Sequence, residues 1–237
     1  MDLIVDRTGD LHLRDGSGGL FAALYPNLPE EDGLQASRNE RLANGYRSIT
    51  LTYGEVSASG FSDILAVVRD SYGGLPKEGG VFVDLGCGTG KPVFAAAAAH
   101  PWHRCIGVEI LGDLHSICQK ALERWEGGLK NAVTVGGSKG ATAEVEFVCG
   151  DFTVLDWSDG DVVFANSTCF DDDLMKKTAA AVAALKEGAI VITTTDPVPS
   201  PALEILEETV MVQAGRSATT CFIQRRLPKA PPAFGPV

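Results

Sequence analysis

The chain has 237 residues, of which 45% are apolar, and its 31 Asp and Glu residues outnumber 20 Lys and Arg to give a formal net charge of -11. The apolar content suffices for one sizeable core with a small appended cap. The negative charge argues against strong nucleic-acid binding by the chain itself, which needs a broad basic surface, and it suits a basic protein partner.

Cysteine placement and the N-terminal sequence bear on the compartment. Six cysteines are scattered without a C-x-x-C pair, which favours buried thiols over disulfides or a zinc site, and we predict no metal. The start, "MDLIVDRTGDLHLRDG", has acidic residues where a signal peptide needs basic ones. No apolar run is long enough to cross a membrane. We therefore expect a soluble intracellular protein, cytoplasmic or nuclear, without a membrane partner.

The first 50 residues differ in character from the rest. They are mixed and polar, with turn signals at Asp15-Gly16 and Pro26-Asn27 and a charged stretch at 36–48 that has helical potential. We predict that residues 1–50 form a small N-terminal cap segment. The segment 61–72 then places apolar residues at helical spacing and predicts a helix.

From residue 80 onward, short apolar runs alternate with helix-forming segments. The predicted strands are 81–86, 105–109, 145–149, 161–166 and 189–195, and the predicted helices are 91–100, 114–125 and 173–188. Such alternation indicates an α/β fold, with a doubly wound, mostly parallel sheet and helices on both faces. Segments 203–213 and 217–226 predict a terminal antiparallel hairpin, which brings the sheet to seven strands.

Two segments interrupt or end this pattern. Residues 135–143, "VGGSKGATA", are rich in Gly and Ser and predict a mobile loop. Residues 228–237 are Pro-rich and predict a disordered tail. We therefore expect one α/β domain over 51–227.

A glycine-rich turn, "DLGCGTG" at 84–90, lies between a predicted strand and a predicted helix. Gly86, Gly88 and Gly90 are spaced more tightly than the G-x-G-x-x-G of dinucleotide-binding proteins, which disfavours a nicotinamide oxidoreductase. Glu109 ends the next strand 19 residues after Gly90 (109 − 90). A tight G-x-G-x-G after an aspartate is typical of enzymes that bind S-adenosylmethionine. Asp84 would then face the ammonium group of that cofactor, and Glu109 its ribose hydroxyls.

Gly150-Asp151-Phe152 follows the third predicted strand. In a parallel sheet this position lies beside the glycine turn, because the carboxyl ends of the strands share one edge. Asp151 would accept a hydrogen bond from the adenine amino group. Phe152 would cover the adenine face.

A fourth signal is "VFANSTCF" at 163–170, in which Asn166, Ser167 and Thr168 stand between apolar residues. Polar groups in an apolar setting cost free energy unless they are hydrogen-bonded. Taken in order, "LTYGEV" (51–56), the glycine turn, "IGVEI", "CGDF" and this segment resemble histone-lysine methyltransferases of the disruptor-of-telomeric-silencing (DOT-one) type over residues 50–195. The resemblance implies a class I (Rossmann-like) methyltransferase fold, S-adenosyl-L-methionine as cofactor, and histone-lysine N-methyltransferase activity.

The resemblance also implies a set of site residues. Those that would contact the cofactor are Tyr53, Gly54, Glu55, Asp84, Gly86, Cys87, Gly88, Thr89, Gly90, Glu109, Asp151, Phe152 and Asn166. Those that would act on the acceptor lysine are Asn166, Tyr53 and Phe170. In this interpretation Asn166 is free for the substrate amine, from which its side-chain oxygen accepts a hydrogen bond, while Tyr53 and Phe170 exclude water.

The chain departs from the family pattern at several positions. Ser167 stands where a second asparagine is usual, Lys91 where a glutamine is usual, and Val56 where a small hydroxyl residue is common. The basic segment that contacts DNA is missing, since the longest basic runs are Lys176-Lys177 and Arg225-Arg226.

Methyl transfer needs a neutral amine, which an apolar channel and a nearby sulfonium both favour, so no dedicated base is expected. Two alternatives stay open. One is methylation of a non-histone protein or a small-molecule amine, and the other is a non-catalytic cofactor-binding subunit. Methyltransferases for adenine, cytosine or glutamine carry two prolines after the asparagine, and Ser167-Thr168 disfavours them. The number of methyl groups added and the oligomeric state stay open.

Overall fold

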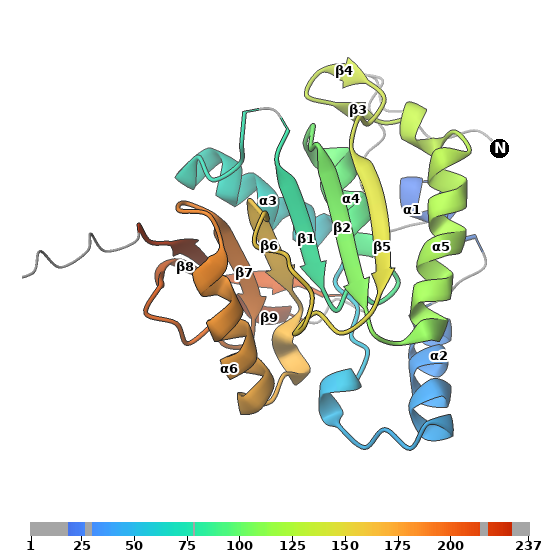
Figure 1. The fold of residues 1–237 in the computed structure, drawn as a ribbon. Helices are drawn as coiled ribbons and strands as arrows, with labels where there is room; N and C mark the ends of the chain where they lie inside the picture. Colours follow the sequence, from blue (N-terminus) through green and yellow to red (C-terminus); the bar gives the residue numbers. More distant parts are fainter. Residues whose placement is uncertain (1–18, 27–29, 78, 214–217, 229–237) are drawn as a thin grey trace, which may run out of the picture.

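A seven-stranded sheet forms the centre of the molecule in a computed structural model that describes residues 19–26, 30–77, 79–213 and 218–228 (Figure 1). Its strand order is β5-β2-β1-β6-β7-β9-β8. The strands are β1 (Val81–Leu85), β2 (Arg104–Glu109), β5 (Glu144–Cys149), β6 (Val162–Ala165), β7 (Ile190–Thr194), β8 (Leu203–Val212) and β9 (Ala218–Arg226). The five strands β5, β2, β1, β6 and β7 pair in parallel, and β9 and β8 join antiparallel. The predicted fold class is confirmed.

Helices connect these strands. The α-helices are α1 (Leu20–Leu24), α2 (Glu30–Ala43), α3 (Ala58–Tyr72), α4 (Lys91–Ala99), α5 (Gly112–Glu126) and α6 (Asp172–Ala181). Short 3-10 helices are η1 (Ile49–Leu51), η2 (Leu129–Asn131), η3 (Ser167–Cys169) and η4 (Val182–Ala184). The helix predicted at 173–188 ends early, because η4 replaces its last α-helical turns.

The two faces of the sheet are covered unequally. On one face, side chains of α3, α4 and α5 pack with Phe82 and Phe164 in a core that includes the fully buried Trp102 and Trp125. On the other face, Val83, Val163 and Val191 form a smaller core beside α6. The connection from β5 to β6 contains no helix, and Trp157 of that connection is buried against this face.

The β1 strand lies in the middle of the parallel part and determines where a ligand can bind. It pairs with β2 on one side and with β6 on the other, so that Val83 is opposite both Ile106 and Val163. The connections leaving β1 and β6 therefore run in opposite directions. In open α/β sheets such a reversal opens a crevice at the carboxyl ends of the strands, where ligands bind.

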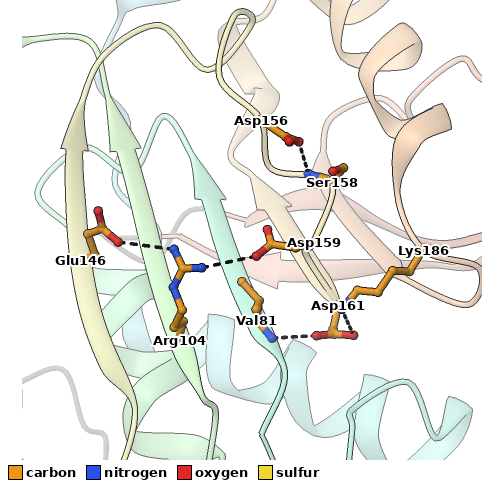
Figure 2. A network of polar contacts seen from close by, with 8 residues as sticks. All are labelled: Val81, Arg104, Glu146, Asp156, Ser158, Asp159, Asp161 and Lys186. Atoms are coloured by element: carbon orange, nitrogen blue, oxygen red, sulfur yellow. Dashed lines mark hydrogen bonds and ion pairs between the residues drawn. The ribbon is translucent and has the colours of Figure 1, made fainter.

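The opposite, amino end of the sheet is tied by charged side chains (Figure 2). Asp161 accepts a hydrogen bond at Oδ2 from the Val81 N–H (2.7 Å) and at Oδ1 from Lys186 Nζ (2.6 Å). Arg104 lies between Glu146 (3.5 Å) and Asp159 (3.4 Å). These contacts join the starts of β1, β2 and β6, far from the carboxyl ends.

The N-terminal helices pack on the main core. Arg124 Nη1 of α5 donates to the Leu24 carbonyl (2.9 Å) at the end of α1. Glu40 of α2 accepts from the N–H groups of Gly112 (2.9 Å) and Asp113 (2.8 Å), so that α2 caps the N-terminus of α5. The division of the chain at residue 50 stays a prediction, and residues 1–18 lie outside the described part.

Four further expectations concern smaller features. Residues 135–143 form a tight hairpin with β3 (Thr134–Val135) and β4 (Ser138–Lys139), because Gly136 and Gly137 adopt positive φ angles of 57° and 82°. All six cysteines are free thiols, and Cys87, Cys105, Cys118 and Cys221 are buried. Beyond Pro228 the predicted tail lies outside the described residues. No helix among the described residues is long and apolar enough to span a membrane.

Candidate cofactor and substrate site

The turn from β1 to α4 is built on glycine for steric reasons. Gly88 has φ of 58°, and a Cβ there would lie 2.5 Å from Cε2 of Tyr53. Gly90 has φ of 85°, and a Cβ there would lie 2.6 Å from Cε1 of Phe147. Both positions therefore combine a backbone conformation that favours glycine with no room for a side chain. The turn is hydrogen-bonded to β2, because the N–H groups of Gly86 and Cys87 both donate to the Val108 carbonyl at 2.9 Å.

Glu109 at the end of β2 is buried and holds the turn. Its Oε2 accepts from the Gly88 N–H (2.8 Å) and its Oε1 from the Leu111 N–H (2.9 Å). Burial raises the pKa of this carboxyl, and the backbone hydrogen bonds oppose that rise. Glu109, which is predicted to bind the ribose, therefore also supports the glycine turn.

Asp84 at the end of β1 carries an unsatisfied buried oxygen. Its side chain is 1% exposed, and Oδ2 has no hydrogen-bond partner. Burial raises the pKa of the Asp84 carboxyl well above its usual value, and the nearby Glu109 raises it further. A buried polar atom without a partner is rare in folded proteins. The ammonium group of an amino-acid ligand would satisfy it, so the residues present fit the methionine part of S-adenosylmethionine.

The loop of Tyr53, Gly54 and Glu55 lies against the glycine turn. The Tyr53 hydroxyl is 3.0 Å from Thr89 Oγ1, and the ring covers Gly88. Glu55 forms a buried ion pair with Lys91, the first residue of α4. The Tyr53 phenol therefore packs onto the turn, and the ring edge lines a cavity beside it.

Asn166, at the end of β6, has hydrogen-bond partners within the chain. Its Nδ2 donates to the Gly54 carbonyl (2.9 Å), which sets the orientation of the amide. Its Oδ1 accepts from the hydroxyls of Thr194 (2.9 Å) and Thr168 (3.2 Å). The expectation that this side chain has no partner in the chain is therefore wrong. Two of the three partners come from a loop 112 positions away and from the end of β7, which no local pattern reveals.

Ser167, which stands where the family usually has a second asparagine, also joins the end of β6 to the end of β7. Its hydroxyl donates to the Thr194 carbonyl (2.6 Å) and accepts from the Thr194 N–H (3.1 Å). Thr195 follows with φ of 71°, the only positive φ outside glycine in the part of the chain that the structure describes. A β-branched residue in this conformation is strained, and such strain concentrates at functional sites.

Two aromatic rings form a wall of the site. The rings of Phe152 and Phe170 stack with centroids 5.7 Å apart and planes 21° apart. Asp151, exposed beside them, accepts from the Thr153 N–H at Oδ1 (2.8 Å) and closes a turn. The residue predicted for adenine and the one predicted for the lysine channel therefore lie side by side.

A cavity of about 350 Å³ runs along these carboxyl ends. The predicted residues that line it are Tyr53, Gly54, Gly86, Gly88, Glu109, Asp151, Phe152, Asn166 and Phe170. A small adjoining cavity is lined by Glu55, Asp84, Cys87 and Thr89, and also by Tyr53, Gly54, Gly86, Gly88 and Asn166. Gly90 lines neither cavity and serves the turn instead.

The cavity also has walls that the sequence interpretation missed. Leu111 and Leu114 supply an apolar side next to Glu109. Residues 50–52 line a further part of the cavity. Asp171 and Asp173 form an acidic rim, to which Lys177 adds one cation. In the sequence, this rim corresponds to the run of aspartates directly after "VFANSTCF". Asp171 also caps α6, because its carboxylate accepts from the Leu174 N–H (2.9 Å).

The family model described as "Histone methylation protein DOT1" matches residues 36–214. This chain belongs to the DOT1 family. This is a family of S-adenosylmethionine-dependent methyltransferases, and the chain has the class I fold. The match begins within α2 and includes the glycine turn, the Asn166 segment and most of the sheet, so the resemblance carried by those motifs is confirmed.

One similar protein is the "Histone-lysine N-methyltransferase, H3 lysine-79 specific" of Dictyostelium discoideum, with 36% identity over 104 residues. That segment is 43% of this DOT1-family chain and only 5% of the length of the Dictyostelium protein.

Solved structures support the fold alone. An RNA methyltransferase from Salinibacter ruber in complex with S-adenosyl-L-homocysteine has 21% identity and a TM-score of 0.50, over 75% of this chain and 94% of that one. TrmN from Thermus thermophilus has 16% identity and a TM-score of 0.50, over 69% and 48%. The putative methyltransferase yhhF from Escherichia coli has 14% identity and a TM-score of 0.50, over 71% and 85%.

Proposed function

We propose that this chain transfers a methyl group to the side-chain amine of a lysine in a basic, histone-type protein. The observation that carries the proposal is the cavity itself. It joins the glycine turn and Glu109 to Asn166 and the stacked Phe152 and Phe170, and its rim is acidic.

The cofactor would be held by charges and backbone groups of the turn. Asp84 offers its unpaired Oδ2 to the ammonium of the methionine part, Glu109 is placed for the ribose hydroxyls, and Asp151 with Phe152 for the adenine. When bound, the cofactor supplies an electrophilic methyl group on a positively charged sulfur.

The acceptor side must deliver a neutral amine without a dedicated base. Phe152 and Phe170 supply apolar surface that excludes water, and an ammonium group loses its proton more readily when it is desolvated. No histidine lines the cavity among the residues that the structure describes. Solvent therefore takes the proton before the amine is enclosed.

Asn166 would orient the amine by a small rearrangement of its neighbours. The Thr168 hydroxyl donates to Asn166 Oδ1 at 3.2 Å and also lies 3.1 Å from Thr194 Oγ1. When Thr168 turns its proton to Thr194, one acceptor position of Asn166 Oδ1 opens toward the cavity. A hydrogen bond from the incoming amine then directs its lone pair.

The substrate class follows from charge. Asp151, Asp171 and Asp173 at the cavity, with a net charge of -11, favour a substrate rich in Lys and Arg. The same charge disfavours DNA, so free histones suit this chain better than nucleosomes do, and the nucleus is the compartment that matches them. A non-histone basic protein is the alternative acceptor, and a small amine is a third.

The test is a transfer assay with S-adenosylmethionine labelled on the methyl group. Free histones, nucleosomes, an unrelated lysine-rich protein, small amines and tRNA are offered separately, and the products are digested and mapped by mass spectrometry. We expect label on lysine Nζ of the basic proteins. Label on RNA with none on protein would contradict the proposal, and binding of cofactor without any transfer would favour a non-catalytic subunit.

A further inference from the structure

A buried ion pair joins the loop of Tyr53, Gly54 and Glu55 to the first turn of α4. Glu55 Oε1 pairs with Lys91 Nζ, and the two side chains are 5% and 21% exposed. Charges that lose their hydration this far are tolerated only when they are paired. The pair therefore sets where the loop lies relative to the helix that follows the glycine turn.

The pair is braced by α1 and by the turn. Lys91 Nζ lies 5.4 Å from the centroid of the Tyr25 ring, which attracts the cation with its face. The Tyr25 hydroxyl donates to the Thr89 carbonyl (2.8 Å), and the Tyr53 hydroxyl contacts Thr89 Oγ1. The loop is thus held at Tyr53 and at Glu55, on either side of Gly54.

Gly54 is exposed and lies between Tyr53 and Glu55, so its position depends on theirs. Its carbonyl accepts the hydrogen bond from Asn166 Nδ2 (2.9 Å). A displacement of the loop therefore changes the partner that sets the orientation of the Asn166 amide. The Glu55–Lys91 pair is thus linked to Asn166 through the backbone of Gly54 alone.

We propose that Lys91 is a positioning residue. Through Glu55, it holds the Gly54 carbonyl where that carbonyl orients the amide of Asn166. The functional part of this inference rests on the proposed function, in which Asn166 directs the acceptor amine. Glutamine, which the family resemblance leads one to expect at this position, carries no charge and could not form the ion pair.

The variants must separate this role from simple loss of stability. Replacing one partner alone would leave a buried, unpaired charge. The test protein is therefore the double variant Lys91→Met with Glu55→Gln, which removes both charges, and Lys91→Arg is the conservative variant. The matched control is Lys130→Met with Glu126→Gln, which removes an ion pair at the end of α5.

Three quantities are measured on the full chain. The first is the side-chain amide signal of Asn166 in ¹⁵N NMR spectra, the second is the affinity for S-adenosylhomocysteine by calorimetry, and the third is kcat for methyl transfer. In the double variant we expect a shifted Asn166 signal and a kcat lowered on the order of 10- to 100-fold, as small misplacements of reacting groups produce. Glu55 and Lys91 line the small cavity beside Asp84, so kcat is compared at saturating cofactor to separate the loss of turnover from any loss of cofactor affinity. The Lys91→Arg and control variants should resemble the wild type.

The outcomes separate the two proposals. An unshifted Asn166 signal in the double variant overturns the positioning role whatever the acceptor is. A shifted signal with an unchanged kcat, or an equal loss in the control variant, overturns it as well. If the wild type methylates no lysine, the proposed function fails, while the amide signal still decides whether Lys91 positions Asn166.

Discussion

Asn166 stands where three segments of the chain meet: the loop at Gly54, the strand end at Thr194 and its own 3-10 helix. This placement gives the amide a defined plane before any substrate arrives. Preorganised groups act in a transition state without reorganising at the moment of reaction. The hydrogen bonds inside the chain thus suit Asn166 to the proposed role of orienting an amine.

Replacing Asn166 by Ala should therefore lower kcat by about 10²-fold, since the acceptor loses its alignment. The affinity for S-adenosylhomocysteine should change little, because the turn and Glu109 are untouched. Steady-state kinetics with a lysine-bearing protein and calorimetry together check this. Equal losses in kcat and in cofactor affinity would assign Asn166 to cofactor binding instead.

Asp84 is a second residue of interest, because burying its carboxyl has a free-energy cost that can be measured. Its folded pKa lies well above the ordinary aspartate value because of burial and Glu109, so the ionised form is disfavoured in the fold. Stability is then fully present below the ordinary pKa and is lost as pH rises through the folded pKa. Burial of this carboxyl thus weakens the ligand-free protein at neutral pH and suits it to bind a cation.

Asp84→Asn should accordingly melt at a higher temperature than the wild type without cofactor at neutral pH. The gain should shrink as pH falls toward the ordinary aspartate pKa. The same variant should lose about 2 kcal/mol or more of cofactor binding energy, because the ammonium loses its charged partner. Melting curves over a pH series and calorimetry measure the two effects. A gain that does not depend on pH would contradict the assigned burial cost.

At the scale of elements, the two ends of the sheet have different tasks. Asp161 ties the start of β1 to Lys186 at the amino end (Figure 2), whereas the carboxyl ends carry the cavity. Phe152 lies at the start of the β5–β6 connection, which has no helix, and stacks on Phe170 at the cavity wall.

Asp161→Ala should lower the free energy of unfolding by about 1–3 kcal/mol, because the Val81 N–H loses its charged acceptor. Cofactor affinity and kcat of the folded fraction should stay at the wild-type level, since the site is at the other edge. Urea unfolding and calorimetry provide the measurements. A loss of cofactor affinity without loss of stability would show that the two edges are coupled.

For the molecule as a whole, net charge would favour the encounter with the proposed basic substrate. A chain of charge -11 with Asp171 and Asp173 at its cavity would attract such a protein electrostatically, and dissolved salt screens that attraction. The KM for a histone-type substrate should therefore rise as ionic strength rises from about 0.05 M to 0.3 M, as the Debye length shortens. The kcat should stay nearly constant, and initial rates over a salt series test this. A KM that is insensitive to salt would remove charge as the basis of substrate choice.

Local sequence was enough to predict the order of strands and helices, the glycine turn and the acidic residue at the end of β2, because each is encoded by neighbouring residues or by a spacing within one β-α-β unit. The same local signals predicted the family to which the chain belongs. The folded structure was needed to find the distant partners of Asn166, the Glu55–Lys91 pair and the Phe152–Phe170 stack. Each of these joins segments that are distant in the chain and meet only when the strands align at one edge. Hydrogen bonds and ion pairs are short-ranged, so a local pattern shows which side chains need a partner and the fold chooses which partner they receive.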